Sequence, residues 1–402
     1  MPWYVLGLST INSTSVSMAF AFLLVLTLLL GRNLFCQQLN VKYKKLLYVY
    51  LFWVLVTLVR GVFVAHSYWE WKAYVNNGLT LFFPLFICFF SNAEFSLKIL
   101  RSYYKIAFWV IPFCVLSLPT YEFFWANAEL CLLLVLCFPL LKFKWKLFSI
   151  IVSIVMILGD FGARSQIIRC VAAWGLVCLY YNRILKNMHL SISKKLYRCF
   201  FILPVFFAIL AFSGIFNVLN TQEYLGDGTV KVSRMGETSE ESISIDTRSG
   251  MYKFISNSLD ENKSWLWGNT NAGSYDGTGW GGSLIELAKN TKDIDTLISK
   301  RFWCESLIFS ILLWMGVIGV ILYSLFYFYA SYLAVFRSNN IWMRLIGIYV
   351  AFRWSWAWID DHSLGLRLIP ITIWILIGMC FSVQLRTFNN MEFRIWFHNI
   401  FK

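Results

Sequence analysis

Long apolar runs separated by short polar loops dominate this chain. A helix needs roughly 20 apolar residues to cross the hydrocarbon core of a bilayer, and the sequence holds eleven runs of about this length. We therefore predict eleven membrane-spanning helices, with one miscount possible where the fifth to seventh crowd together. The predicted spans lie near residues 12–31, 45–65, 77–93, 104–120, 123–141, 146–160, 164–182, 198–216, 304–334, 341–359 and 364–385.

Lys and Arg concentrate in every second loop. They follow the first, third, fifth, seventh and ninth predicted helices and fill the C-terminal tail, whereas the alternate loops carry few of them. Because positively charged loops stay in the cytoplasm, the N-terminus is predicted outside and the C-terminus inside. Residues 1–31 lack a cationic start and a clear cleavage site, so they are predicted to be a membrane helix rather than a removed signal peptide.

One long segment breaks the apolar pattern and defines the predicted organisation. Residues 217–303 hold nine Lys and Arg against twelve Asp and Glu, so the rest of the chain carries a net charge of +17. The positive charge is thus a topology signal and a possible contact with anionic lipid. We predict helices one to eight over 1–216, a large external loop over 217–303, and helices nine to eleven with a cytoplasmic tail over 304–402.

The large loop carries signals of internal structure. Asp246 and Thr247 are placed to cap a short helix over 251–259, and the capping-box pattern from Ser283 to Glu286 predicts a second helix. Residues 268–282 are rich in glycine and asparagine, and no Lys-Ser/Thr pair follows as in a nucleotide-binding P-loop. They are predicted to form a flexible loop on the substrate side.

Composition excludes several classes of protein. The chain has 402 residues, of which 59% are hydrophobic and 14% charged, with mean hydropathy +0.63. Soluble domains are about 45–50% apolar and about 25% charged, so a soluble enzyme, a disordered protein and a nucleic-acid-binding module are unlikely candidates. Nine of the ten cysteines lie in or next to apolar runs without CxxC spacing, which predicts neither a disulfide nor a zinc site.

Ionisable residues at the predicted external rim of the helices are the candidate site. Asp160 ends helix six, Arg164 begins helix seven, Arg248 lies in the large loop, Glu305 begins helix nine and Arg367 lies in helix eleven. Arginine holds phosphates bidentately and keeps its charge, which suits a diphosphate leaving group. A carboxylate in a partly dry cavity can act as general base toward a sugar hydroxyl.

Other charged positions have competing structural explanations. Arg164 is equally well explained as a snorkelling anchor at a helix end, and Arg169 could pair with a lipid or with Asp160. For Arg60 and Arg353, deep within predicted helices two and ten, an ion pair is favoured over a role in catalysis. His362, next to Asp361, is a reserve candidate for the general base.

Four spaced motifs resemble the O-antigen polymerase and ligase superfamily (Wzy- and WaaL-type proteins). They cover roughly the C-terminal 250 residues, in the order and on the predicted side found in that family. The motifs are 162–168 with its small residues and arginine, 246–252 followed by 265–269, 305–319 with its paired glycines, and 361–370.

The resemblance implies a metal-independent, inverting glycosyltransferase without a cofactor. By position, Arg164, Arg248 and Arg367 would hold the diphosphate. Ligases of the family usually have a histidine at the start of the third motif, where this chain has Glu305. This difference favours a polymerase and leaves the base open among Glu305, Asp361 and His362.

The resemblance thus implies an all-α, GT-C-like polymerase of the bacterial inner membrane that makes O-antigen or a related polysaccharide. Its expected partners are an undecaprenyl-diphosphate-linked glycan donor and acceptor and a chain-length-regulating membrane protein, with no nucleic acid. One alternative is an O-antigen ligase that transfers the glycan to lipid A-core. A lipid-linked oligosaccharide flippase is disfavoured by the 87-residue loop, and a membrane acyltransferase would need His66 or His362 at a cavity.

Overall fold

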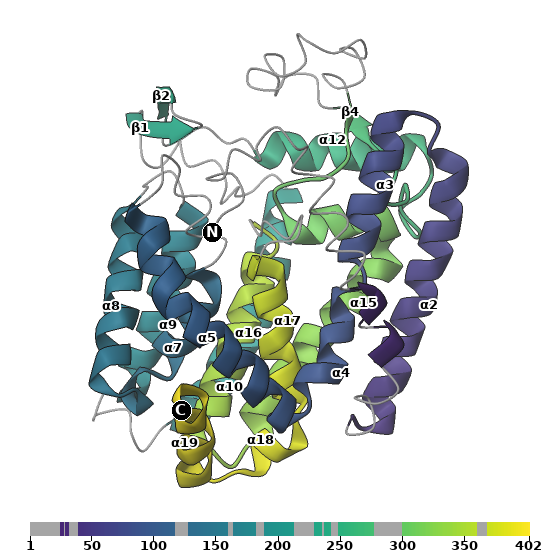
Figure 1. The fold of residues 1–402 in the computed structure, drawn as a ribbon. Helices are drawn as coiled ribbons and strands as arrows, with labels where there is room; N and C mark the ends of the chain where they lie inside the picture. Colours follow the sequence, from purple (N-terminus) through teal and green to yellow (C-terminus); the bar gives the residue numbers. More distant parts are fainter. Residues whose placement is uncertain are drawn as a thin grey trace.

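The computed structural model shows a mostly helical protein (Figure 1). Long helices stand side by side, and α12 lies across the end opposite α18 and α19. The described residues are 25–27, 29–31, 39–116, 128–159, 164–181, 189–212, 229–234, 237–242, 248–276, 300–359 and 368–402.

The α-helices are α2 (Val41–Val64), α3 (Tyr68–Thr80), α4 (Phe86–Phe90), α5 (Ala93–Leu116), α7 (Leu132–Leu136), α8 (Phe143–Leu158), α9 (Arg164–Tyr181), α10 (His189–Phe212), α12 (Arg248–Glu261), α15 (Leu307–Phe336), α16 (Ile341–Trp356), α17 (Leu368–Phe381), α18 (Val383–Thr387) and α19 (Asn390–His398). Short 3-10 turns are η3 (Phe83–Leu85), η4 (Glu129–Cys131), η5 (Phe138–Leu140) and η7 (Asn399–Phe401). Two antiparallel strand pairs join β1 (Thr229–Arg234) to β2 (Glu237–Ser242) and β3 (Tyr275–Asp276) to β4 (Lys300–Arg301).

Several helices have the length and composition of membrane spans. Among the described residues, three segments are long and apolar enough to cross a bilayer: Val41–Val64, Tyr68–Phe90 and Leu307–Phe336. Shorter apolar helices cover Ser165–Leu179 and Ile371–Phe381. The helical, membrane-type character predicted from the sequence is therefore confirmed, while the first predicted span lies largely outside the described residues.

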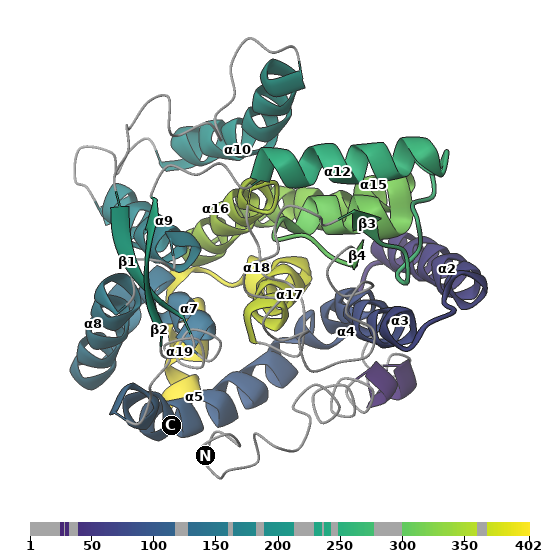
Figure 2. The ribbon, with the colours of Figure 1, turned by 90° about the horizontal axis from the view of Figure 1, so that it is seen from above.

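Helices α15, α16 and α17 form the centre of the molecule (Figure 2). α4 packs on α17, α10 packs on α16, and α2 packs on α15. The core between these helices is rich in aromatic rings. The ring centroid of Trp374 on α17 lies 5.2 Å from that of Tyr323 and 5.8 Å from that of Phe326, both on α15. Rings of this size bury much apolar surface with defined geometry, so they fix how the central helices pack.

The third predicted span begins earlier than expected and is interrupted. A capping box starts α3, because Ser67 Oγ accepts from Glu70 N at 3.3 Å and Glu70 Oε2 accepts from Ser67 N at 3.0 Å. This cap places the helix start nine residues before the predicted 77. Pro84 then lies in the short turn η3 that separates α3 from α4, since proline cannot donate within a helix.

The fourth predicted span also begins earlier. α5 starts at Ala93 rather than 104, and Asn92 Oδ1 caps it by accepting from Glu94 N at 2.9 Å and Phe95 N at 3.1 Å. The cations Lys98 and Arg101, predicted to lie in a loop, are therefore helical. An amphipathic helix can carry such cations on its outer face, which a count of apolar residues misses.

The fifth predicted span, 123–141, is not one long helix in its described part. Residues 129–140 form η4, α7 and η5 in succession, and Pro139 lies inside η5. Almost all of these side chains are buried. The run is apolar because it is surrounded by protein, which hydropathy alone cannot distinguish from contact with lipid.

The large polar segment combines a confirmed helix with strands that were not predicted. The helix expected over 251–259 is present as α12, whereas its predicted capping residues and the helix expected from Ser283 lie outside the described residues.

The absence of disulfides was predicted wrongly, because Cys88 in α4 is disulfide-bonded. Sequence spacing does not reveal pairing between cysteines that only the fold brings together.

Candidate functional site

The C-terminal end of α16 is a meeting point for segments far apart in the sequence. We call residues 356–359 at the end of α16, together with the side chains hydrogen-bonded to them, the α16 junction. Ser306 Oγ donates to Ala357 O at 2.9 Å and Trp358 O at 3.1 Å, and Ile308 N donates to Ala357 O at 3.1 Å. These bonds fix the start of α15, which begins two residues after Glu305.

α12 joins the same junction through one aromatic residue. Tyr252 OH donates to Trp358 O at 2.8 Å, and the tyrosine ring stacks on Phe309 with centroids 3.9 Å apart. Arg248 is the first residue of α12, one helical turn before Tyr252. The structure therefore brings the backbone of Arg248 near the segment that carries Glu305.

α9 reaches the end of α16 from another direction. Trp356 Nε1 donates to Ser165 Oγ at 2.9 Å, and Ser165 follows Arg164, the first residue of α9. Three of the four motif segments thus converge here, and the chain continues from Ile359 toward the fourth. The side chains of Arg164 and Arg248 and the whole of Asp361, His362 and Arg367 lie outside what the structure describes, as does Asp160.

Glu305 is partly buried beside the β3–β4 pair. Burial raises the pKa of neighbouring Tyr275 well above its usual range, and the Glu305 charge adds to this shift. The phenol donates a hydrogen bond to Trp303 O at 3.1 Å. Glu305 remains a candidate base at the edge of the α16 junction.

A fully buried ionic cluster lies about one helical turn from the α16 junction. Glu129 Oε1 accepts from Arg169 Nη1 at 3.3 Å and from Arg353 Nη1, so one carboxylate binds two guanidinium groups from different helices. All three side chains have no exposed surface. The expectation that Arg353 belongs to an ion pair is confirmed. Glu129 is a described partner of Arg169, while the expected pairing with Asp160 falls on a residue outside the described ones.

Polar neighbours complete this Glu129–Arg169–Arg353 cluster. Arg169 Nη2 donates to Ser165 Oγ at 3.0 Å, the same hydroxyl that accepts from Trp356. In the amide orientation that satisfies both partners, Gln166 donates to Glu129 Oε2 and accepts from Arg169 Nη2, each at 3.1 Å. The cluster is therefore bonded directly to the ends of α9 and α16 that form the junction.

Sequence reasoning missed Glu129, although a signal was present. It is the only charged residue in the predicted span 123–141, and a lone carboxylate in an apolar run normally has a partner.

Within the described part of the chain, no group of three or more His, Cys, Asp and Glu side chains gathers as metal ligands would.

A break in α15 forms the second unusual feature near the site. Gly316 interrupts the helix with φ 67° and ψ −169°, and the loop after α12 satisfies the freed backbone groups. Asn269 N donates to Leu313 O at 2.6 Å, and Val317 N donates to Trp265 O at 2.8 Å. Irregular backbone at membrane depth is tolerated where protein supplies such bonds.

The described part of the loop that completes α15 is hydrogen-bonded to neighbouring elements. Asn77 Nδ2 donates to Asn271 O at 3.0 Å and to Phe302 O at 3.1 Å, while Asn271 Nδ2 donates to Tyr74 O at 2.6 Å. Lys300 Nζ forms an ion pair with Glu70 Oε1 at 3.1 Å. The first part of the predicted flexible stretch, 268–276, is thus bonded to α3 and α15.

Arg60 anchors the same loop. Its Nη1 donates to Trp267 O at 2.8 Å and its Nη2 to Gly268 O at 3.0 Å. This explains an arginine within α2 as a backbone-binding residue. Replacing Arg60 with alanine should lower the free energy of unfolding by about 1–2 kcal/mol, since two charged hydrogen bonds at a partly exposed site are lost.

Equilibrium unfolding in mixed detergent micelles tests this expectation, with Arg198→Ala on α10 as the control. Arg198 is exposed, so its removal should change stability by less than about 0.5 kcal/mol. Equal effects of the two substitutions would contradict the anchoring role of Arg60.

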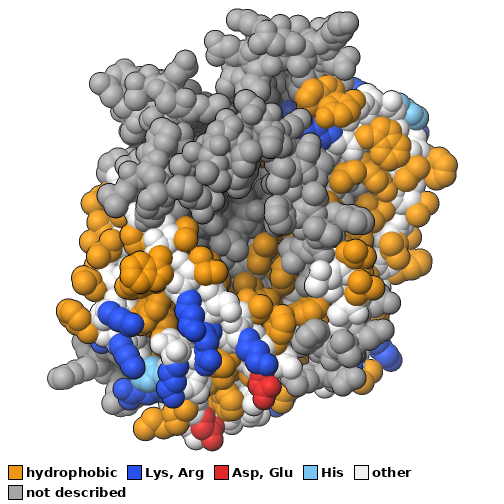
Figure 3. Space-filling view, in the orientation of Figure 1, with side chains coloured by type: hydrophobic (Ala, Val, Ile, Leu, Met, Phe, Trp, Pro, Cys, Tyr) orange, Lys and Arg blue, Asp and Glu red, His pale blue; other side chains and the backbone are white. Residues whose placement is uncertain are grey.

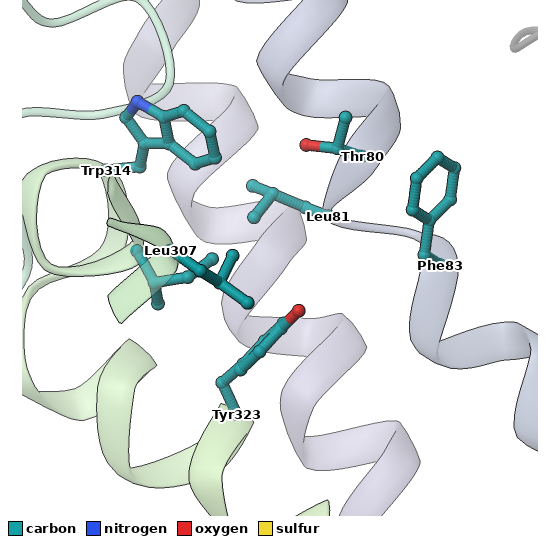
Figure 4. A pocket seen from close by; sticks show the side chains of 7 residues that line it. Thr80, Leu81, Phe83, Leu307, Trp314 and Tyr323 are labelled. Atoms are coloured by element: carbon teal, nitrogen blue, oxygen red, sulfur yellow. The ribbon is translucent and has the colours of Figure 1, made fainter. Parts of the chain in front are cut away.

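A small cavity lies beside the first part of α15 (Figure 4). Trp314 and Tyr323 approach it from α15, and Thr80, Leu81 and Phe83 approach it from the junction of α3 and η3. Its volume is about 10 Å³, roughly the room that one water molecule occupies. It is too small for a sugar.

Comparison of the chain with protein-family models, curated proteins and solved structures finds no match.

Proposed function

We propose that this protein is a membrane glycosyltransferase that joins undecaprenyl-diphosphate-linked oligosaccharide units into O-antigen or a related surface polysaccharide. The observation that carries the proposal is the α16 junction. Segments bearing Arg164, Arg248 and Glu305 meet there through Ser165, Tyr252 and Ser306. Segments that carry two arginines and a carboxylate supply the kinds of group that bind a diphosphate and take a proton from a sugar hydroxyl.

The proposed topology places this junction on the periplasmic face of the inner membrane. Eleven spans with the N-terminus outside put the start of α9, the start of α15 and the end of α16 on one side, opposite the Lys- and Arg-rich loops. The substrate sugars would then meet the enzyme outside the cytoplasm, where a chain-length-regulating membrane protein is the expected partner.

In the proposed reaction, a sugar hydroxyl of one lipid-linked unit attacks the anomeric carbon of the growing chain. The bond from that carbon to the diphosphate oxygen breaks, and configuration inverts. Glu305, Asp361 or His362 takes the hydroxyl proton. Arg164, Arg248 and Arg367 stabilise the negative charge of the departing undecaprenyl diphosphate, a role in which preorganised positive charge is effective.

An apolar groove supports the choice of a lipid-linked substrate. It has a volume of about 250 Å³ and lies between α10, α15 and α16, lined by residues that include Phe201, Phe328 and Trp354. Trp354, the groove residue on α16, lies within one helical turn of the α16 junction. An isoprenoid tail is apolar and flexible, and such a surface would hold it at membrane depth.

The test is the length of surface polysaccharide, resolved on a gel, in a deletion strain complemented with different variants. We expect wild type to restore a ladder of many repeats. Arg164→Ala, Arg248→Ala and Glu305→Gln should reduce polymerisation by at least about tenfold, as loss of a transition-state contact does.

The control is Arg337→Ala, which removes an exposed arginine at the other end of α15 and should leave the ladder intact. A deletion strain with core carrying one repeat unit supports polymerisation. Free lipid-linked long chains with undecorated core would instead identify a ligase, and unchanged ladders in all three site variants would overturn the site assignment.

A further inference from the structure

A strongly basic surface lies at the end of the molecule opposite the α16 junction. Figure 3 shows Lys and Arg side chains gathered around this lower end, where α5 and α19 lie. We call its exposed cations the α5–α19 basic face. They are Lys98, Lys105, Lys142, Lys144, Arg394 and Lys402.

Tertiary contacts bring these cations together from three separate parts of the sequence. Arg101 on α5 donates to Asn399 O from Nε at 3.0 Å and from Nη2 at 2.6 Å. The ring of Phe401 lies 4.7 Å from that of Trp145 and 5.7 Å from that of Tyr104. The C-terminal residues thus hold α5 and the start of α8 side by side, and the three groups of cations form one surface.

Large apolar side chains are exposed among the cations. Phe143, between Lys142 and Lys144, is 82% exposed, and Trp109, one turn beyond Lys105 on α5, is 76% exposed. On α19, Met391 and Ile395 are exposed on either side of Arg394. Exposed apolar groups of this size interleaved with Lys and Arg are typical of elements that lie at a membrane surface.

Carboxylates oppose this positive charge only weakly. On α5 and α19 the exposed acidic residues are Glu94 and Glu392. Glu392 Oε2 accepts from Asn389 N at 2.8 Å, so its charge is directed to the start of its own helix. A dense group of cations at the level of the headgroups attracts anionic lipid, and the exposed apolar side chains favour lipid over an acidic soluble protein.

We propose that the α5–α19 basic face is a binding site for the phosphate headgroups of anionic phospholipids in the adjoining leaflet. The cations hold the headgroup, and the side chains of Trp109 and Phe143 contact the upper part of the acyl chains. The proposal does not depend on the proposed glycosyl transfer, because the face lies at the opposite end of the helices from the α16 junction.

The experiment titrates the purified full-length protein in detergent with dioctanoyl phosphatidylglycerol or dioctanoyl phosphatidylcholine and counts bound lipid by native mass spectrometry. We expect wild type to bind the anionic lipid at least about tenfold more tightly. The variant Lys98→Gln, Lys105→Gln, Lys144→Gln should lose most of this preference.

The matched control is Lys42→Gln, Lys45→Gln, Lys195→Gln, which removes three exposed cations from the same predicted side of the membrane but from other helices. It should keep the preference, and both variants should keep the wild-type melting temperature. Equal losses in the two variants would show a diffuse effect of net charge and overturn the site. Tighter binding of a polyglutamate peptide than of phosphatidylglycerol would also overturn it.

Discussion

Replacing Glu129 with alanine is expected to destabilise the fold by about 3–5 kcal/mol, the usual cost of removing one partner from a buried ion pair. The side chains of Glu129, Arg169 and Arg353 are completely buried, and the carboxylate bonds to both guanidinium groups. Without it, the two buried guanidinium groups lose the carboxylate that both of them bind. The ends of α9 and α16 should separate, and the α16 junction should lose its geometry.

Equilibrium unfolding in mixed detergent micelles measures this effect. Glu94→Ala removes an exposed carboxylate from α5 and serves as the control, with an expected change below about 0.5 kcal/mol. A Glu129→Ala variant as stable as the control would contradict the prediction.

A second variant distinguishes charge from packing at the same place. The triple substitution Glu129→Leu, Arg169→Met, Arg353→Met should recover most of the stability lost in Glu129→Ala, because well-packed apolar side chains often replace a buried ionic cluster at no net cost. If the cluster positions the α16 junction for glycosyl transfer, this stable triple variant should still make shorter polysaccharide than wild type. A full ladder would mean that the cluster serves stability alone.

Gly316→Ala is expected to be the next most damaging substitution, at about 3 kcal/mol or more. With φ 67° and ψ −169°, Gly316 adopts a conformation that is essentially restricted to glycine, which costs other residues about 1–3 kcal/mol. An added Cβ would also lie 2.5 Å from Trp267 N and closer still to the carbonyl group of Leu266. Neither backbone group can move without breaking the bonds that complete α15.

Gly175→Ala is the matched control. Gly175 lies inside α9, and a Cβ added there meets nothing within 4 Å, so alanine should stabilise the helix by about 0.5–1 kcal/mol. Melting temperatures of the two variants in detergent should therefore move in opposite directions. A Gly316→Ala protein that melts with or above wild type would show that the break in α15 is not required.

The contacts around the break in α15 could not be predicted from the sequence. Arg60 was recognisable as an unusual charge in an apolar helix, but its partners, the carbonyls of Trp267 and Gly268, lie more than 200 positions away. The stretch from 268 was predicted to be flexible because glycine and asparagine favour loops. Here those residue types permit close approach to α15 instead.

Properties that add up locally along the chain could be predicted from the residues alone. Runs of apolar residues identified helices such as α2, α15 and α16, since each such segment must satisfy its own backbone hydrogen bonds at membrane depth. A change in composition marked the large polar segment, and local capping signals predicted α12. The placement of Lys and Arg separated the two predicted sides.

Which distant groups meet depends on how the helices pack and could not be predicted from the residues. Glu129 pairs with Arg353 across 224 positions, the loop after α12 completes α15, and Ser165, Tyr252 and Ser306 converge on the end of α16. The physical reason is that hydrophobicity depends on what each segment contains, whereas ion pairs and hydrogen bonds act over a few ångströms in space. Such contacts exist only once the helices have packed in one arrangement.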